Sequence, residues 1–196
     1  ARRGYRVTAS DLSPAMLAEA RRKARGLDIR FRRGDMRSVR RGRFDAAISI
    51  FNAVGHLAPD DFEQTMRNVR RNLEPGGLYV FDILNLEFMR RGGFKSYPFF
   101  DIARTVDGSL HVRLNANRLD RRSGVMHVRQ RLWIQHGFEQ PIVVDDIWDM
   151  QLYTIEQLAG MLERAGFLRA RVQGGPRQRR FDPRTSPSIL VAAERD

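Results

Sequence analysis

The chain has 196 residues, no cysteine and a formal net charge of +12. This length fits one domain, or one domain that carries an insert. The lack of cysteine excludes a disulfide framework, a cysteine-ligated zinc site and a thiol nucleophile, and it agrees with a cytoplasmic location. No apolar run reaches the length of about 18 residues that a membrane span needs, so we expect no membrane association.

Almost all of the positive charge comes from arginine, because Lys23 and Lys95 are the only lysines. The arginines are spread along the chain rather than gathered into one stripe. This distribution favours a solvated basic surface over a nucleic-acid site, although binding to nucleic acid stays open.

The N-terminal part alternates between strand and helix patterns. Residues 5–9 form a short β-prone run, after which Ser13 offers a helix N-cap and Pro14 a favoured first helical position. Apolar residues then recur at helical spacing until Gly26, which predicts the end of the helix. Residues 27–31 alternate between apolar and polar side chains, as a half-buried strand does.

A second strand, helix and strand follow. Residues 44–51 are mostly apolar, which suits a strand buried on both faces of a parallel sheet. A helix is predicted from residue 59, a sharp turn at residues 74–77 and another buried strand at residues 78–84. This order predicts an α/β fold with a doubly wound parallel sheet.

The pattern changes after residue 93. Residues 94–147 show repeated β-prone alternation with little helical periodicity, and we expect an antiparallel β-rich insert there. Three turn pairs punctuate this segment: Asp107-Gly108, Ser123-Gly124 and His136-Gly137. Residues 1–93 and 148–196 would then together form the main α/β domain.

Helical periodicity returns after the insert. Thr154 with Gln157 resembles a capping box, and Gly166 predicts the end of that helix. Residues 167–172 and 188–193 have the pattern of two closing strands around a basic loop that contains Arg177–Arg180.

Five segments in chain order resemble class I S-adenosylmethionine-dependent methyltransferases. They are residues 7–17 (VTASDLSPAML), 31–36 (FRRGDM), 44–52 (FDAAISIFN), 73–77 (LEPGG) and 165–167 (AGF). The resemblance implies a Rossmann-like doubly wound sheet with strand order 3-2-1-4-5-7-6. It also implies S-adenosylmethionine as cofactor.

The first two segments carry the cofactor-binding residues that the resemblance implies. Asp11 would accept hydrogen bonds from the two ribose hydroxyls, with Leu12 beside it and Met16 near the adenine. Asp35 would accept from the adenine amino group, next to Met36. Structural alternatives remain open, because Asp11 and Asp35 also suit ordinary turns and Met16 also suits the core.

The third segment leads into the predicted active site. Phe51 and Asn52 match positions that line the methyl-donor pocket in the family, although Phe51 also suits a core aromatic. Residues 52–57 (NAVGHL) are similar to a segment of amino-sugar N-methyltransferases, which makes His56 the candidate catalytic base. A purely structural role for His56 is the alternative.

The resemblance implies transfer of a methyl group to nitrogen or oxygen of a small-molecule acceptor, with the insert as a lid over that acceptor. The alternatives are a tRNA or rRNA methyltransferase and a non-catalytic binding protein on the same fold. A homodimer is left open.

The sequence departs from the family at its start. The first strand and glycine-rich loop of the family would precede Ala1. We therefore expect a gap between the second and fourth strands, with unpaired backbone groups, and cofactor binding by this polypeptide alone is in question.

Overall fold

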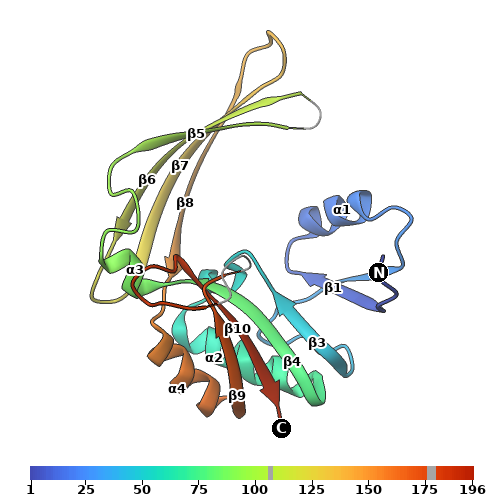
Figure 1. Cartoon of the computed structure of the whole chain (residues 1–196). Coiled ribbons are helices and arrows are strands. Elements are labelled where there is room, and N and C mark those ends of the chain that lie inside the picture. The colour runs from blue at the N-terminus through green and yellow to red at the C-terminus, as the bar shows by residue number, and fades with distance from the viewer. Residues whose placement is uncertain (106–107, 176–179) are drawn as a thin grey trace.

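The computed structural model describes residues 1–105, 108–175 and 180–196 (Figure 1). Asp107 of one predicted turn, and Arg177 and Arg179 of the predicted basic loop, lie outside the described residues. The helices and strands follow in this order: β1 (Val7–Asp11), α1 (Pro14–Lys23), β2 (Ile29–Arg33), β3 (Phe44–Ser49), the 3₁₀ turn η1 (Ala53–His56), α2 (Pro59–Arg71), β4 (Leu73–Leu84), α3 (Leu86–Arg90), β5 (Phe99–Arg104), β6 (Leu110–Leu119), β7 (Val125–Gln135), β8 (Ile142–Gln151), α4 (Ile155–Arg164), β9 (Phe167–Gln173) and β10 (Ser188–Arg195).

The first unit is a two-stranded parallel sheet connected by α1. β1 and β2 pair in register from Val7 opposite Ile29 onwards. The Ser13 hydroxyl accepts a hydrogen bond from the backbone of Met16 at 3.3 Å, and Pro14 is the first helical residue. Both predictions for the start of this helix are therefore confirmed.

The second sheet has the strand order β3-β4-β10-β9. β3 runs parallel to β4, whereas β10 is antiparallel to both β4 and β9. Alternation along β4 puts Tyr79, Phe81 and Ile83 on one face, where they are fully buried. They join a core with residues of α2 and α4, among them Phe62, Met66, Leu158 and Leu162. These two helices therefore cover one face of the sheet.

The start of β4 differs from the prediction. We expected a turn at residues 74–77 before the strand, but β4 begins at Leu73, which pairs with Phe44. The register then shifts before Ala46 pairs with Leu78, and Gly76 takes a positive φ of 75° inside this irregular stretch. The extra residues form a bulge in the strand, and a bulge of this kind favours glycine at a left-handed position.

The third sheet is an antiparallel meander with the order β5-β6-β7-β8. Figure 1 shows its long strands rising away from α2 and α4. At its base, Met126 and Val128 pack against Leu86 and Met89 of α3. α3 was not predicted from the sequence.

The two parallel units are separate sheets in the described residues. β1 is hydrogen-bonded to β2, and β3 to β4, but the two pairs are not joined by a strand ladder. The described residues thus form a β1-β2 sheet and a β3-β4-β10-β9 sheet, rather than one continuous sheet. None of the described helices is long and apolar enough to cross a membrane.

Candidate functional site

The loops that follow β1 and β2 meet at the carboxyl edge of the small sheet. β1 ends at Asp11, opposite the last residue of β2, Arg33. The backbone amide of Gly34 donates a hydrogen bond of 3.1 Å to the carbonyl oxygen of Asp11. Since Asp35 follows Gly34 directly, the structure brings the two predicted cofactor-binding carboxylates to one edge. Ligands bind at the carboxyl ends of strands in open α/β sheets.

The Asp11 side chain is exposed at this edge. Its Oδ1 accepts a hydrogen bond of 2.8 Å from the backbone of Ser13, which fixes the carboxylate at the start of α1. Leu12 and Met16 are each 59% exposed. Met16 is therefore not a core residue in this structure, and an exposed carboxylate lies next to two exposed apolar side chains.

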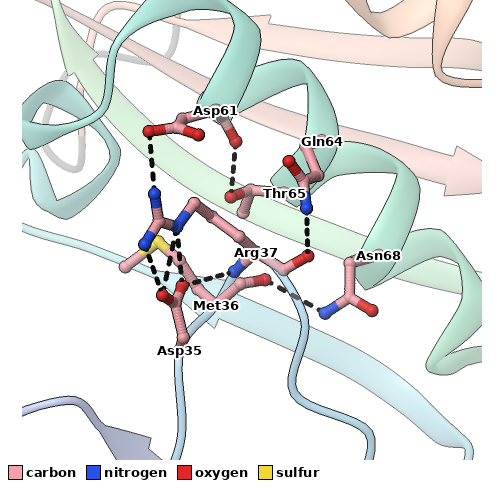
Figure 2. Close-up of polar contacts among 7 residues, drawn as sticks. All are labelled: Asp35, Met36, Arg37, Asp61, Gln64, Thr65 and Asn68. Atoms are coloured by element: carbon pink, nitrogen blue, oxygen red, sulfur yellow. Dashed lines mark hydrogen bonds and ion pairs between the residues drawn. The ribbon is translucent and has the colours of Figure 1, made fainter.

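Asp35 forms an ion pair with Arg37 (Figure 2). The Arg37 guanidinium donates to both carboxylate oxygens, at 2.7 Å to Oδ2 from Nη2, and the Arg37 backbone donates at 2.9 Å to Oδ1. These hydrogen bonds hold the pKa of the Asp35 carboxyl below its usual value. The other end of the guanidinium reaches Asp61 of α2 at 3.0 Å, and the two carboxylates together raise the pKa of Arg37.

Further hydrogen bonds fasten the loop after β2 to α2. Asn68 donates from Nδ2 to the carbonyl oxygens of Met36 at 3.0 Å and Val39 at 2.9 Å. Gln64 donates to the carbonyl oxygen of Arg37 at 3.4 Å, as Figure 2 shows. Met36 is half-buried and packs against the main core. The loop therefore fixes the small sheet to α2, although no strand pairing connects the two sheets in the described residues.

The loop after β3 has an unusual backbone. Phe51 and Asn52 have positive φ values of 64° and 56°, which residues other than glycine seldom adopt. Such strain persists only where surrounding contacts enforce it, and it is concentrated at functional sites. The Phe51 side chain is 92% exposed, so it is not a core aromatic in this structure.

Asn52 connects this loop to two other strands. Its backbone amide donates to Asp82 Oδ1 at 3.0 Å, and its Oδ1 accepts from the backbone of Leu84 at 3.0 Å. Its Nδ2 donates to the sulfur of Met150 on β8 at 3.4 Å. Both ends of the Asn52 amide thus make contacts within the protein, and these contacts keep Phe51 at the surface.

His56 is the last residue of η1 and is exposed. The turn contacts both β4 and β8. Three residues later α2 begins at Pro59, and Asp61 in its first turn holds Arg37. The structure therefore gathers the predicted residues into two groups, one after β1 and β2 and one after β3, joined through the start of α2.

Sequence reasoning missed the residues that make this connection. Arg37 and Asp61 are 24 positions apart, and Asn52 and Met150 are 98 apart. No local pattern links residues at such distances, so neither contact has a signal in a single sequence. Arg37 could have been suspected only from its place beside Asp35.

A family model matches the N-terminal part of the chain. Residues 1–77 match the family model described as a methyltransferase domain. These residues contain every predicted site residue, from Asp11 to His56. The first 77 residues of the chain are therefore similar to a methyltransferase domain.

A curated relative and a solved structure are similar to the chain over most of its length. The chain is 26% identical over 176 residues to the putative methyltransferase YqeM of Bacillus subtilis, which covers 88% of this chain and 68% of that protein. An S-adenosylmethionine-dependent methyltransferase from Clostridium acetobutylicum superposes with a TM-score of 0.78 at 17% identity, over 97% of this chain and 75% of that one.

A solved methyltransferase whose substrate class is named has a similar fold. CalS10, an amino pentose methyltransferase from Micromonospora echinaspora, superposes with a TM-score of 0.70 at 23% identity. The superposition covers 95% of this chain and 73% of CalS10, so at most a small part of the third sheet lies outside it. The methyltransferase fold of this chain therefore includes the third sheet.

Proposed function

We propose that this methyltransferase binds S-adenosylmethionine at the carboxyl edge of β1 and β2 and moves its methyl group to nitrogen or oxygen of a small molecule. The observation that carries the proposal is the hydrogen bond from Gly34 to Asp11, which brings the loop that carries Asp35 to the end of β1, beside exposed Leu12 and Met16. An exposed carboxylate suits a pair of ribose hydroxyls, and two exposed apolar side chains suit a purine ring.

Asp35 fits the adenine-binding role even though Arg37 occupies both of its oxygens. A carboxylate offers about four lone-pair sites, and it can accept from a guanidinium and from a further donor. Because Arg37 keeps Asp35 ionised and oriented, we assign Arg37 a positioning role in cofactor binding.

The bound cofactor would supply an electrophilic methyl carbon attached to a sulfonium. The protein's part is to align the acceptor, exclude water and take up the proton that the acceptor loses as its bond to carbon forms. Phe51 is exposed at the loop after β3 and would form one wall of the path between the two substrates. His56, exposed five residues later, would accept the proton on a ring nitrogen.

We further propose that residues 94–147 act as the acceptor lid, whereas residues 1–93 and 148–196 hold the cofactor. Contacts of β8, which begins inside residues 94–147, with η1 support this division, because they place the third sheet against the turn after β3. An amine on a small molecule is the favoured acceptor, since CalS10 is an amino pentose methyltransferase. We expect the reaction to take place in the cytoplasm.

Release of S-adenosylhomocysteine from S-adenosylmethionine tests the proposal. The protein would be incubated with the cofactor and a panel of small amines and alcohols that includes amino sugars. We expect product formation that depends on both the protein and an acceptor. Cofactor binding without turnover on any acceptor in the panel, but with methylation of added tRNA, would contradict the small-molecule assignment.

A further inference from the structure

One face of the β5-β6-β7-β8 sheet takes no part in the hydrophobic cores of the described residues. The residues of this sheet that belong to a core or pack against one lie together on the opposite face: Leu119, Met126, Val128, Trp148 and Met150. This core includes Leu86 and Met89 of α3, and Met150 also contacts Asn52. We call this face, which meets α3 and the loop after β3, the inner face, and we call the other one the outer face.

The outer face carries apolar side chains in neighbouring rows of paired residues. The rows contain Ile102, Val112, Trp133 and Val143, then Phe100 and Leu114, then Ala116 and Ile147. None of these side chains is buried, and those on the edge strands β5 and β8 are 50% exposed or more. The ring centroids of Phe100 and Trp133 lie 6.4 Å apart, so neighbouring rows form one continuous apolar surface.

An apolar sheet face of this kind is normally covered. A sheet with an apolar face buries it against a second layer, and two stacked sheets lie about 10 Å apart. Monomeric proteins seldom expose an apolar patch larger than about 600 Å². In the part of the chain that the structure describes, no element buries the outer face. The outer face is therefore a candidate interface.

The charged groups on the outer face indicate which partner fits it. Nε and Nη2 of Arg131 donate to the two carboxylate oxygens of Asp145, at 2.6 Å each. His127 Nδ1 lies 2.7 Å from Asp149 Oδ1 on the same face. Because these acids already have partners within the sheet, the face offers apolar area rather than a field of one sign. A second copy of the same face matches it without bringing unpaired carboxylates together.

The outer face is also large enough for a dimer. β6, β7 and β8 have 10, 11 and 10 residues. With a rise of about 3.3 Å per residue and about 4.8 Å between strands, the four strands present a face of about 600 Å². Two such faces would bury about 1,200 Å², which is above the roughly 1,000 Å² that a specific interface needs. Arg118 and Arg129 lie toward the end of the face that is nearer α3, where the rim of an interface tolerates charge.

We propose that the chain forms a homodimer with twofold symmetry, in which the outer faces of the two β5-β6-β7-β8 sheets pack on each other. A twofold axis brings the same patch of both subunits together, so one self-complementary apolar face is sufficient. The inner face of each sheet stays beside the loop after β3. The dimer is therefore compatible with the proposed lid and does not depend on methyl transfer.

Val143 and Val144 provide a matched pair for the test. They are neighbours on β8, and alternation puts Val143 on the outer face and Val144 on the inner face. Val143 is 50% exposed and Val144 is 44% exposed, so an aspartate at either position leaves the core of the subunit intact.

Sedimentation velocity measures the oligomeric state of the parent and the two variants. The parent should have twice the subunit mass at micromolar concentrations. Val143→Asp should weaken dimerisation at least about 100-fold, because each dimer would bury two unpaired carboxylates. Val144→Asp introduces the same charge on the other face and should leave dimerisation unchanged.

Thiol labelling shows which face is covered, and it needs only small substitutions. The chain has no cysteine, so Val143→Cys and Val144→Cys each introduce a single thiol. A maleimide should label the thiol at position 143 at least about fivefold more slowly far above the dissociation constant than in dilute protein, because mass action leaves few monomers. The thiol at position 144 should react at the same rate in both.

The outcomes decide the proposal. A parent that stays monomeric up to about 0.1 mM, or equal dimerisation constants for Val143→Asp and Val144→Asp, would overturn it. If Val143→Asp does not fold, the labelling rates decide, and equal rates at position 143 in dilute and concentrated protein would overturn it as well. A dimer of the expected kind that does not bind S-adenosylhomocysteine would leave this proposal standing and count against the proposed function.

Discussion

Arg37 connects carboxylates from two parts of the fold. It pairs with Asp35 after β2 and with Asp61 in the first turn of α2, at 2.7 Å and 3.0 Å. All three side chains are partly exposed, so each pair alone contributes little to stability. Their joint effect is geometric, because they set the position of the Asp35 carboxylate relative to α2.

Arg37→Gln tests this connection. The variant should be slightly less stable than the parent at neutral pH, since partly exposed ion pairs contribute little to stability. Because the pairing lowers the folded-state pKa of Asp35, its stabilisation is present above the ordinary value of 3.8 and is lost as the pH falls through the lower folded value. Urea unfolding of parent and variant should therefore differ at neutral pH and converge in strong acid.

Arg40→Gln is the control for that experiment, because Arg40 is exposed in the same loop. It removes the same charge without removing the ion pairs to Asp35 and Asp61. Equal losses in both variants, or a difference that persists in strong acid, would contradict the role assigned to Arg37.

His56 carries the catalytic prediction. His56→Ala should lower kcat by about 10²-fold to 10⁴-fold, the usual contribution of a general base, and leave the affinity for S-adenosylhomocysteine unchanged. His136→Ala is the matched control, since His136 is exposed in the turn between β7 and β8. Turnover by His56→Ala equal to that of His136→Ala would exclude His56 as the base.

At the scale of single residues, Asp11 and Asp35 were predicted because residues 7–17 and 31–36 resemble methyltransferase segments, and each resemblance is carried by neighbouring residues. The sequence could not predict what those side chains contact. The pairing of Asp35 with Arg37, and the internal hydrogen bonds of Asn52, depend on where α2 and β8 lie in three dimensions.

The conformation of the loop after β3 depends on Asn52, whose backbone is left-handed. Asn52 is the residue type other than glycine that tolerates such a backbone best, and its side chain joins β4 to β8. The loop is therefore held by long-range contacts and by local backbone tolerance together.

Two substitutions at Asn52 separate these contributions. Asn52→Ala should cost about 2 kcal/mol, because it loses the hydrogen bond to Leu84 and because alanine tolerates a left-handed backbone less well than asparagine. Asn52→Gly loses the same side-chain contacts but relieves the backbone, so it should be more stable than Asn52→Ala by about 1 kcal/mol. Urea unfolding measures both. An Asn52→Gly variant no more stable than Asn52→Ala would show that the backbone is not strained there.

Helix starts were the most predictable elements. Ser13 caps α1, and Thr154 forms a capping box with Gln157 at the start of α4, as the local sequence indicated. The predicted start of β4 was wrong because Leu73 belongs to the strand through its pairing with Phe44 of β3, which the local sequence does not show. α3 was missed because its five residues carry too little periodicity, and contacts with the base of the third sheet stabilise it.

At the scale of the molecule, α2 contacts both the β3-β4-β10-β9 sheet and the loop after β2. Phe62 and Met66 on one side of this helix are fully buried against the β3-β4-β10-β9 sheet. Asp61 and Asn68 hold the loop after β2. The sequence predicted the α/β order of the elements and the β-rich character of the third sheet. In the described residues β1 and β2 form a sheet of their own, and no strand ladder joins β1 to β3.

Titration calorimetry with S-adenosylhomocysteine tests the central claim most directly. We predict saturable binding to the parent protein, loss of at least about tenfold in affinity in Asp11→Ala, since a charge-assisted hydrogen bond is lost, and no change in Asp28→Ala. Asp28 is the matched control because it is exposed and precedes β2, at the opposite edge of the same sheet. Absence of binding to the parent, or equal affinities in the two variants, would contradict a cofactor site at the carboxyl ends of β1 and β2.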